Sequence, residues 1–302
     1  MPPEPLGILL LSGTHERAHY AFVLAAGAAA LGRSVVLFAS NAGCHALLKE
    51  VGGVGQARLK SASVLVVGAG GLGSPLLLYL AAAGVGRIGI IDDDVVELSN
   101  LQRQVAHTTA RLGLPKVESA AVAAHAINPD VAIETHRLRL GPGNALDLIG
   151  RYDIVCDGSD NFATRFLVAD ACVLARRTLV SAAVLRFEGQ LSVFKPHAPG
   201  EHPCYRCLYP EPPPAGQVPS CGEAGVLGAV TGVLGTLQAT EALKEILGIG
   251  DSLAGRLLIW DALATSCRII RLKRDPACPA CCAHATLRDL SQHVIAVPVC
   301  GV

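Results

Sequence analysis

The sequence predicts an α/β fold built on a doubly wound, mostly parallel sheet, and three observations support this class. Short apolar runs alternate with helix-like segments over residues 64–182, as in parallel strands joined by right-handed crossovers. A glycine-rich loop directly follows the first of these runs. Beyond residue 189, strand-like stretches continue around one long helical segment. Together these features indicate a Rossmann-like sheet whose C-terminal half carries additional strands.

The composition favours a folded chain without a dominant charge. The 302 residues include 25 basic and 25 acidic side chains, and 51% are hydrophobic against 17% charged. A chain of this length and hydrophobicity can bury a large core, which argues against intrinsic disorder. Its formal net charge of zero gives no general attraction to nucleic acid or to anionic membranes. We therefore expect no nucleic-acid partner.

The sequence predicts neither export nor a membrane span. Its longest apolar stretches, residues 21–31 and 76–85, are shorter than the ~20 residues that cross a bilayer. The first residues have no basic region before an apolar one, so no secretory signal is predicted. We expect a soluble cytoplasmic protein, in which the 11 cysteines are mostly reduced and serve as metal ligands or reactive thiols.

The first 50 residues are expected to form a separate βαβ segment. Gly7–Ser12 and Ser34–Ala39 have the pattern of buried strands, and residues 18–31 that of an Ala-rich helix between them. One such unit cannot cover both faces of two parallel strands, so we expect it to dock elsewhere or to be poorly ordered. The run Gly52–Gly55 marks the junction, which places the segment at residues 1–50 and the main domain at 51–302.

The elements of the main domain follow from apolar periodicity and from stop signals. Pro75 suits the first turn of a helix that Gly84 ends, and Asn128-Pro129 ends the next helix. The predicted strands are Val64–Val67, Arg87–Ile91, Asp153–Cys156 and Thr178–Ala182, and the predicted helices are Ser74–Ala83, Pro115–Ile127 and Val226–Leu247.

The glycine-rich loop occupies residues 68–73 (GAGGLG), between the first of these strands and its helix. In this context Gly68 permits a tight turn, Gly70 lets the backbone approach a phosphate, and Gly73 lets helix and strand pack closely. Asp92, at the end of the next strand, is placed to accept hydrogen bonds from ribose hydroxyls. The pattern predicts an adenine-nucleotide site with NAD as the default ligand, and glycines used only for packing are the alternative.

Two cations near this loop favour ATP over NAD. The run Ser99–Gln104 (SNLQRQ) follows Asp92 closely, and Lys116 lies thirteen residues beyond Arg103. A dehydrogenase has little use for these cations, whereas a triphosphate needs fixed positive charge around the transferred group. We expect Arg103 and Lys116 to be surface cations that line a cleft, and a solvated loop charge is the alternative for each.

Two carboxylates close the strand Asp153–Cys156. Asp157 and Asp160 belong to the run Asp157–Asn161, at the strand edge where ligands of such folds bind. Magnesium is commonly shared between one or two carboxylates and phosphate oxygens, and Asp160 is the carboxylate that we expect to hold it. Arg165, four residues after Asn161, either faces this site or forms a salt bridge.

These motifs carry a resemblance to a known family. The matching stretches extend from about residue 55 to residue 281, about three quarters of the chain, and the SNLQRQ run is the most specific. The chain resembles the ThiF/MoeB/HesA adenylyltransferases, prokaryotic relatives of the ubiquitin-activating enzymes. The matching stretches are Val64–Gly73, Asp92–Asp94, Leu98–Gln104, Pro115–Glu118, Asp157–Asn161, Glu188–Gln190 and Glu223–Gly225.

The resemblance implies an enzyme that uses Mg·ATP to adenylate the C-terminal glycine of a ubiquitin-like sulfur-carrier protein ending in Gly-Gly, for sulfur transfer of the molybdopterin or thiamine type. It also implies a homodimer. An attacking carboxylate is already anionic, so no general base is required and no histidine is expected beside these motifs. By resemblance Asp92 binds the ribose, Asn100, Arg103 and Lys116 bind the phosphates, and Asp160 binds magnesium. The predicted nucleotide site as a whole consists of Gly68, Gly70, Gly71, Gly73, Asp92, Ser99, Asn100, Arg103, Lys116, Asp160 and Asn161.

Two Cys-x-x-Cys pairs predict a structural zinc site. Four thiolates suit tetrahedral Zn²⁺, but the 70 residues between the pairs exceed the usual spacing of a contiguous ribbon, so the fold must bring them together. A redox Cys-x-x-Cys is the alternative. Cys221 lies in a Pro-rich loop, and in relatives a cysteine here can carry a thioester or persulfide; an exposed loop thiol is the alternative. The predicted zinc ligands are Cys204, Cys207, Cys278 and Cys281.

The chain also departs from the family pattern. Members usually open with an Arg-Tyr-x-Arg-Gln stretch whose arginine reaches the partner subunit's nucleotide, and nothing of that form precedes Gly55. Residues 9–45 instead resemble, more weakly, the first part of a DsrE-like sulfur-relay domain. These departures leave two alternative functions: a catalytically impaired scaffold that binds nucleotide or carrier, and, from the glycine loop alone, an NAD-dependent oxidoreductase.

Overall fold

The computed structural model describes residues 6–10, 35–39, 53–214 and 225–293. The chain divides into two compact units, residues 1–60 and 61–302. In the first unit, strands β1 (Leu6–Leu10) and β2 (Val35–Ala39) pair in parallel, as the predicted βαβ segment requires. The helix expected at residues 18–31 lies outside the described residues. The DsrE-like character of this segment and a domain boundary at residue 50 therefore stay predictions.

The second unit is built on an eight-stranded sheet with the order β10-β9-β8-β7-β6-β3-β4-β5. Strands β7, β6, β3, β4 and β5 are parallel, whereas β8, β9 and β10 are antiparallel. This confirms the mostly parallel α/β sheet with additional strands in the C-terminal half. Its strands are β3 (Ser63–Val67), β4 (Arg87–Ile91), β5 (Ala132–His136), β6 (Ile154–Asp157), β7 (Thr178–Leu185), β8 (Glu188–Phe194), β9 (Arg256–Asp261) and β10 (Ser266–Arg271).

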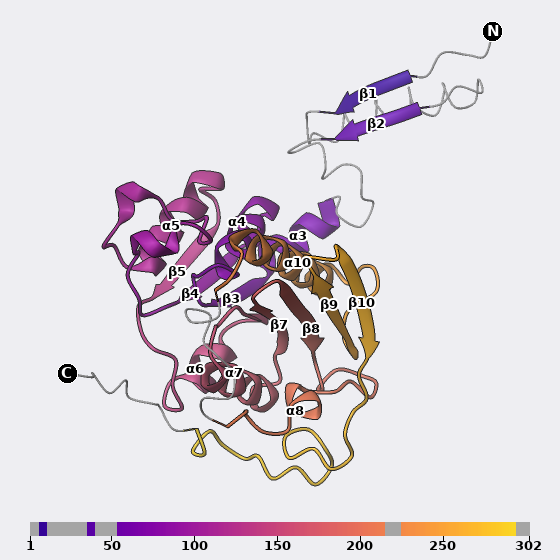
Figure 1. Cartoon of the computed structure of the whole chain (residues 1–302). Coiled ribbons are helices and arrows are strands. Elements are labelled where there is room, and N and C mark those ends of the chain that lie inside the picture. The colour runs from indigo at the N-terminus through magenta and orange to yellow at the C-terminus, as the bar shows by residue number, and fades with distance from the viewer. Residues whose placement is uncertain (1–5, 11–34, 40–52, 215–224, 294–302) are drawn as a thin grey trace. The chain divides into compact units, whose positions relative to one another are not determined.

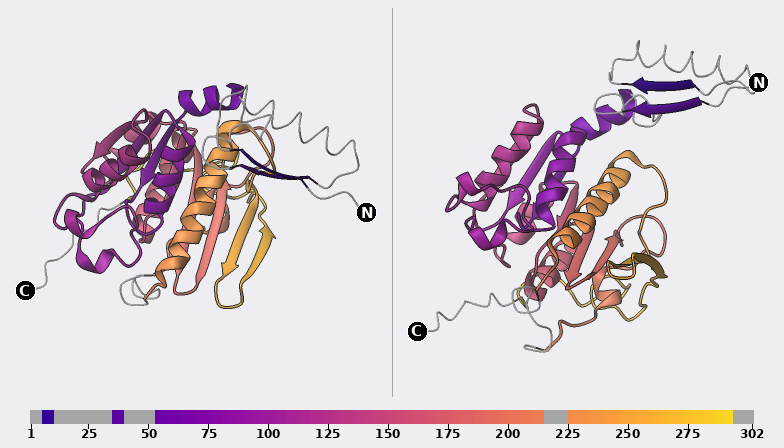
Figure 2. Two further views of the ribbon diagram at one scale, coloured as in Figure 1. Left: turned by 90° about the horizontal axis from the view of Figure 1, so that it is seen from above. Right: turned by 45° about the horizontal axis from the view of Figure 1, so that its top comes forward.

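Helices cover both faces of this sheet (Figures 1 and 2). Helices α4, α5 and α10 pack together on one face, and α6, α7 and α8 lie on the other. The helices within the described residues are α3 (Gly53–Ser61), α4 (Gly73–Ala83), α5 (Lys116–Ile127), α6 (Ala145–Gly150), α7 (Phe162–Leu174), α8 (Tyr205–Leu208) and α10 (Gly228–Leu247), with 3₁₀ turns η3 (Leu98–Asn100) and η4 (Thr109–Arg111). No helix in the described part of the chain combines the length and apolar character needed to span a bilayer.

Helix α4 shows how local sequence sets the fold around the glycine loop. Pro75 lies in its first turn, where a missing N–H costs nothing, and Gly84 ends it with a left-handed φ of 81°. The helix is buried along most of its length, because α10, α5 and the sheet surround it. Strand β3 is buried at every position, as a central parallel strand should be.

The topology creates a binding edge between two particular strands. Strand β3 lies between β4, which follows it in the chain, and β6, which comes later. The crossover after β3 therefore leads toward one edge of the sheet and the crossover after β6 toward the other, so the loops that follow these two strands diverge. Such a switch point is where doubly wound sheets bind ligands.

Candidate functional site

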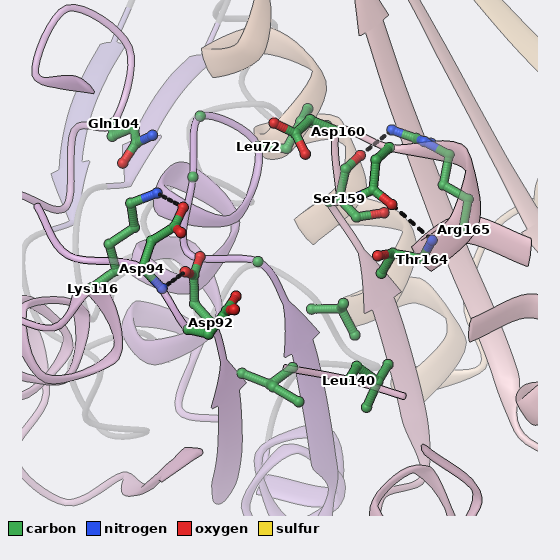
Figure 3. Close-up of a pocket in the computed structure, with 18 of the residues that line it drawn as sticks. Leu72, Asp92, Asp94, Gln104, Lys116, Leu140, Ser159, Asp160, Thr164 and Arg165 are labelled. Carbon is green, nitrogen blue, oxygen red and sulfur yellow. Dashed lines mark hydrogen bonds and ion pairs between the residues drawn. The ribbon is translucent and has the colours of Figure 1, made fainter. Parts of the chain in front are cut away.

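One cavity opens at this switch point and collects most of the predicted nucleotide residues. The loops after β3, β4 and β6 all contribute to its wall. Figure 3 shows Asp94, Gln104 and Lys116 on one side and Ser159, Asp160 and Arg165 on the other. Gly73, Ser99 and Asn100 do not line it. The predicted residues that do are Gly68, Gly70, Gly71, Asp92, Arg103, Lys116, Asp160 and Asn161.

The glycine loop depends on two of its glycines for its shape. Gly68 has a φ of 89°, a conformation that residues with a side chain rarely adopt. A Cβ on Gly73 would lie 1.8 Å from the carbonyl oxygen of Gly68, so loop and helix can meet this closely only without it. Gly70, by contrast, has an open side that faces only Gln104, 3.7 Å from the position of its Cβ. This arrangement exposes the loop backbone to the cavity.

Asp92 joins the end of β4 to the glycine loop. Its Oδ2 accepts a hydrogen bond of 2.8 Å from the Ala69 N–H, and its Oδ1 accepts one of 2.9 Å from the Asp94 N–H. Burial raises the pKa of this carboxyl, although nearby Lys116 and both backbone hydrogen bonds act in the opposite direction. Each oxygen keeps a lone pair for a further donor, such as a ribose hydroxyl.

Lys116 differs from the expectation of a free surface cation. Its side chain is 8% exposed, and its Nζ lies 2.7 Å from Oδ2 of Asp94. The pairing has a geometric reason: the Lys116 N–H also donates to the Asp94 carbonyl, at 2.9 Å, so the first turn of α5 is fastened beside the end of β4. Lys116 still lines the cavity, but an anion bound there would contact an ammonium group that is already paired with Asp94.

Arg103 agrees better with the expected surface cation, whereas its neighbours Ser99 and Asn100 make local hydrogen bonds. Its side chain is partly exposed and lines the cavity, and its Nη1 donates to the Ser99 carbonyl at 3.3 Å. Asn100 is buried, and its Oδ1 accepts from the Glu97 N–H at 3.1 Å, which caps η3. The hydroxyl of Ser99 donates to a Glu97 oxygen at 3.3 Å. Nucleotide binding by Ser99 and Asn100 stays a prediction.

The loop after β6 separates the two carboxylates that the sequence places there. Asp157 is buried, accepts from the Ser159 N–H at 2.9 Å and lies 3.9 Å from Arg165, so it serves the structure of the loop. Asp160 is exposed and lines the cavity, which leaves its oxygens accessible to a magnesium ion. Asn161 caps α7 by accepting from the Thr164 N–H at 2.8 Å. Arg165 does both things considered for it, because it lines the cavity and pairs with Asp157.

Two buried polar atoms in the wall have no partner and suit a polar ligand. Gln104 is 3% exposed and Ser159 is 8% exposed, yet Oε1 of Gln104 and Oγ of Ser159 make no hydrogen bond within the described part of the chain. Buried polar atoms are rarely left unsatisfied unless a ligand or water completes them. The cavity thus fits a group rich in hydroxyls and phosphate oxygens. Gln104 belongs to the motif Leu98–Gln104 and Ser159 to the motif Asp157–Asn161. Neither residue is among the site residues predicted from the sequence.

The expectation that no histidine lies beside these motifs is wrong. His107 follows Gln104 by three residues and is 5% exposed behind the glycine loop. Its Nε2 lies 2.9 Å from the Ala69 carbonyl oxygen, and its Nδ1 lies 2.8 Å from the Ser119 hydroxyl. Burial lowers the pKa of His107. The ring does not line the cavity, so it is not placed to take a proton from a ligand there.

A second pocket adjoins the first through shared residues. Asp160, Arg165 and Val184 line both. Its remaining wall comes from β7, β8, β9, α7 and the segment around α8, and it includes the aromatic side chains of Tyr205 and Tyr209. An extended chain lying in this pocket would bring its end next to Asp160.

The two Cys-x-x-Cys pairs meet, as predicted, although they lie far apart in the sequence. The Sγ atoms are 3.9 Å apart for Cys204–Cys207, 3.5 Å for Cys204–Cys278 and 3.4 Å for Cys207–Cys281. Tetrahedral zinc thiolates with Zn–S bonds of ~2.3 Å have S···S distances of about 3.8 Å, so the cluster fits a metal ion. Hydrogen bonds from the Cys204 and Cys281 thiols lower the pKa of Cys207, whereas hydrogen bonds with Cys207 and Cys281 raise the pKa of Cys204. Cys221 lies outside the described residues, and its covalent role stays a prediction.

The fold and the cavity define a doubly wound α/β protein with a ligand site at the switch point of its sheet. Within this class the chain belongs to the ThiF family, whose family model matches residues 42–280. This confirms the family resemblance that the motifs carry.

Curated relatives and solved structures agree with this assignment. The chain is 57% identical over 248 residues to bovine "Adenylyltransferase and sulfurtransferase MOCS3", covering 82% of this chain and 54% of that protein. It thus spans about half the length of this relative. It is 53% identical over 248 residues to "Sulfur carrier protein adenylyltransferase" of Thermus thermophilus, covering 81% of this chain and 91% of that protein. A crystal structure of E. coli MccB with ATP matches with a TM-score of 0.67 at 22% identity, over 76% of this chain and 69% of that one, and shows the shared fold.

Proposed function

We propose that the protein is an adenylyltransferase that activates the C-terminal carboxylate of a ubiquitin-like sulfur-carrier protein with Mg·ATP. The observation that carries this proposal is the single cavity in which the glycine loop, Asp92, Arg103, Lys116 and Asp160 converge. The names of the relatives, which describe adenylyltransferases of sulfur carriers, support the same reaction. Molybdopterin or thiamine-type sulfur transfer is the proposed context.

The proposed reaction joins two anions and needs charge compensation more than proton transfer. A carboxylate oxygen of the carrier attacks the α-phosphorus, the bond to the bridging oxygen breaks, and pyrophosphate leaves with its electron pair. Arg103 and Lys116 offset the charge that builds up on the phosphates. Asp160 would hold magnesium, which would supply further positive charge beside the phosphates. Asp92 orients the nucleotide through its ribose.

The carrier's tail requires a narrow path to the α-phosphate. A Gly-Gly end has no side chains, so it can enter extended through the second pocket, which reaches the nucleotide cavity at Asp160 and Arg165. Backbone pairing along a strand is the usual way to hold such a segment. A carrier with a bulky residue in place of its last glycine should therefore be a poor substrate.

The remaining proposals concern metal, assembly and compartment. Zinc is the proposed occupant of the four-cysteine cluster, in a structural role. Metal analysis of the purified protein tests this, with one zinc per chain expected in the wild type and none after Cys204→Ser.

A homodimer is the proposed assembly. The cytoplasm is the proposed compartment, because free thiols of this kind persist in a reducing environment.

Pyrophosphate exchange tests the proposed activity. The protein, Mg·ATP and candidate carriers ending in Gly-Gly are incubated with labelled pyrophosphate, and carrier-dependent return of label into ATP is expected. ATP binding without exchange, with every carrier tried, would favour the scaffold alternative instead. Binding of a nicotinamide dinucleotide in preference to ATP would support the oxidoreductase alternative, which gives no purpose to Arg103 or to Asp160.

A further inference from the structure

His107 lies outside the cavity, yet it contacts the backbone that shapes it. The Ala69 carbonyl can only accept, so Nε2 of His107 carries the proton that it receives. In the neutral ring Nδ1 is then an acceptor, and the Ser119 hydroxyl donates to it. The buried ring is thus fixed in one tautomer by two partners from different parts of the fold.

The two partners belong to the two structures that must cooperate at the phosphates. Ala69 is the second residue of the glycine loop, and Ser119 lies in the first turn of α5, which also presents Lys116. On its other side Ala69 is held by Asp92, which also accepts from the Asp94 N–H, and Asp94 pairs with Lys116. These bonds close a circuit that runs from the loop through β4 to α5 and back to the loop through His107.

We propose that His107 is a positioning residue that holds the glycine loop against the first turn of α5 and so fixes the phosphate-binding backbone relative to Lys116. The inference deepens the proposed function and rests on it for its catalytic meaning. Without His107 the circuit opens on one side: the Ala69 carbonyl loses its strong partner, and only the 3.4 Å contact from the Ser74 hydroxyl remains. Of the bonds in the circuit, only the one from the Ala69 N–H to Asp92 then joins Ala69 to α5.

Further hydrogen bonds hold the segment that carries His107 and so restrict movement of the ring. Arg111 donates from Nε to the Thr108 hydroxyl at 3.1 Å and from Nη1 to the Ser119 carbonyl. The His107 N–H donates to the Gln104 carbonyl at 3.0 Å. The same turn therefore places Gln104, whose Oε1 has no partner within the described residues, in the cavity wall and His107 behind it, so a displacement of one moves the other.

Two substitutions of His107 distinguish the effect of its hydrogen bonds from the effect of its size. His107→Phe keeps a ring but removes both hydrogen bonds, whereas His107→Gln keeps a donor near the position of Nε2. We expect amide hydrogen exchange of residues 68–71 to speed up about tenfold in His107→Phe and to stay within about threefold of wild type in His107→Gln. The amides of β8 serve as an internal control and should not change. Ser119→Ala, which removes only the donor to Nδ1, should have an intermediate effect and covers the case that His107→Phe does not fold.

Nucleotide affinity gives the functional readout in the same proteins. The Kd for Mg·ATP, measured without carrier, should rise about tenfold in His107→Phe and recover in His107→Gln. In the exchange assay the KM for ATP should rise while the KM for the carrier stays unchanged, which a general loss of structure would not produce. Equal loop exchange in wild type, His107→Phe and Ser119→Ala would overturn the proposal. If the wild type binds no ATP, the proposed function fails, and loop exchange still decides the role of His107.

Discussion

The cations of the cavity act in two different ways because their surroundings differ. Arg103 is partly exposed, and among the described residues its side chain donates to one backbone carbonyl, so it can turn its full charge toward a phosphate. Lys116 is buried and already paired with Asp94, so part of its charge is compensated before any ligand arrives. Arg103 is therefore the cation whose loss should affect the transition state most.

Replacing Arg103 with alanine should lower kcat for adenylation by about 100- to 1,000-fold, the usual effect of losing one charge-stabilising group. Folding should be unaffected, because within the described part of the chain the side chain makes one long hydrogen bond near the surface. Arg137→Ala is the matched control, since Arg137 is exposed and does not line the cavity. Steady-state exchange rates and thermal unfolding of both variants check this prediction, and equal kcat values in both would remove Arg103 from the mechanism.

The lowered pKa of His107 predicts how the stability of the protein depends on pH. Burial lowers its pKa below the ordinary 6.5, with help from the charges of Lys116 and Arg111 and against the hydrogen bond to Ala69. The unfolded chain therefore binds this proton more readily than the folded one, so the contribution to stability is present above about pH 6.5 and is lost as the pH falls toward the folded value. Between about pH 7 and pH 5, the free energy of unfolding should fall more steeply in wild type than in His107→Gln. Urea titrations at several pH values measure it, and parallel curves would contradict it.

Residue types were predictable from the sequence, but their pairings were not. The motif runs indicate Asp92, Arg103 and Asp160, because these types recur where nucleotides bind. The partner of Lys116 lies 22 residues earlier in the chain, and the partner of His107 lies 38 residues earlier. Neither separation follows a helical or strand period, so only the folded chain reveals them.

At the scale of elements, the loop from β3 to α4 carries the tightest steric constraint of the site. Val66 and the Gly68 carbonyl both approach the position that a Cβ on Gly73 would take. Helix α4 in turn packs against α10 and α5, so it cannot move away to relieve a clash. The glycine is thus required for the shape of the loop rather than for contact with the ligand.

Gly73→Ala should destabilise the fold by about 1–3 kcal/mol, the usual cost of overpacking, and should weaken ATP binding. Gly232→Ala is a matched control, because Gly232 lies inside α10 with nothing within 4 Å of its Cβ position. A helical alanine there should instead stabilise by about 0.5–1 kcal/mol. Chemical denaturation of the two variants gives the comparison, and two shifts of the same sign would show that the clash is not what defines the loop.

Strong apolar periodicity made most elements of the parallel sheet predictable. Strand β4 has the predicted bounds, and α4 begins one residue before its predicted start. Strand β5 and helix α6 were not predicted. The first lies at the edge of the sheet and has no buried residue, so it lacks an apolar run, and the second has six residues, too few to show a period.

Across the whole molecule, one buried carboxylate joins helix α7 to the cysteine cluster. Asp170, on α7, is fully buried and accepts two hydrogen bonds of 2.7 Å from Arg206, which lies between Cys204 and Cys207. His293 contacts the same carboxylate at 2.8 Å. Burial alone would raise the pKa of Asp170, but these partners outweigh it and lower the pKa.

Asp170→Asn should cost about 3–5 kcal/mol of stability, because it leaves a buried arginine without its counter-charge. Asp147→Asn is the control: its carboxylate pairs with Arg151 at the surface, is 74% exposed, and should contribute less than about 0.5 kcal/mol. Equilibrium unfolding of the two variants tests the difference. Equal small losses would mean that α7 and the cysteine cluster are not held together by this ion pair.

The most direct test of the account is the intact mass of a carrier protein after incubation with this protein, Mg·ATP and pyrophosphatase. We expect a carrier ending in Gly-Gly to gain the mass of one adenylyl group, and the gain to disappear with Arg103→Ala and with a carrier lacking its last glycine. An unmodified carrier, in the presence of protein that demonstrably binds ATP, would contradict it.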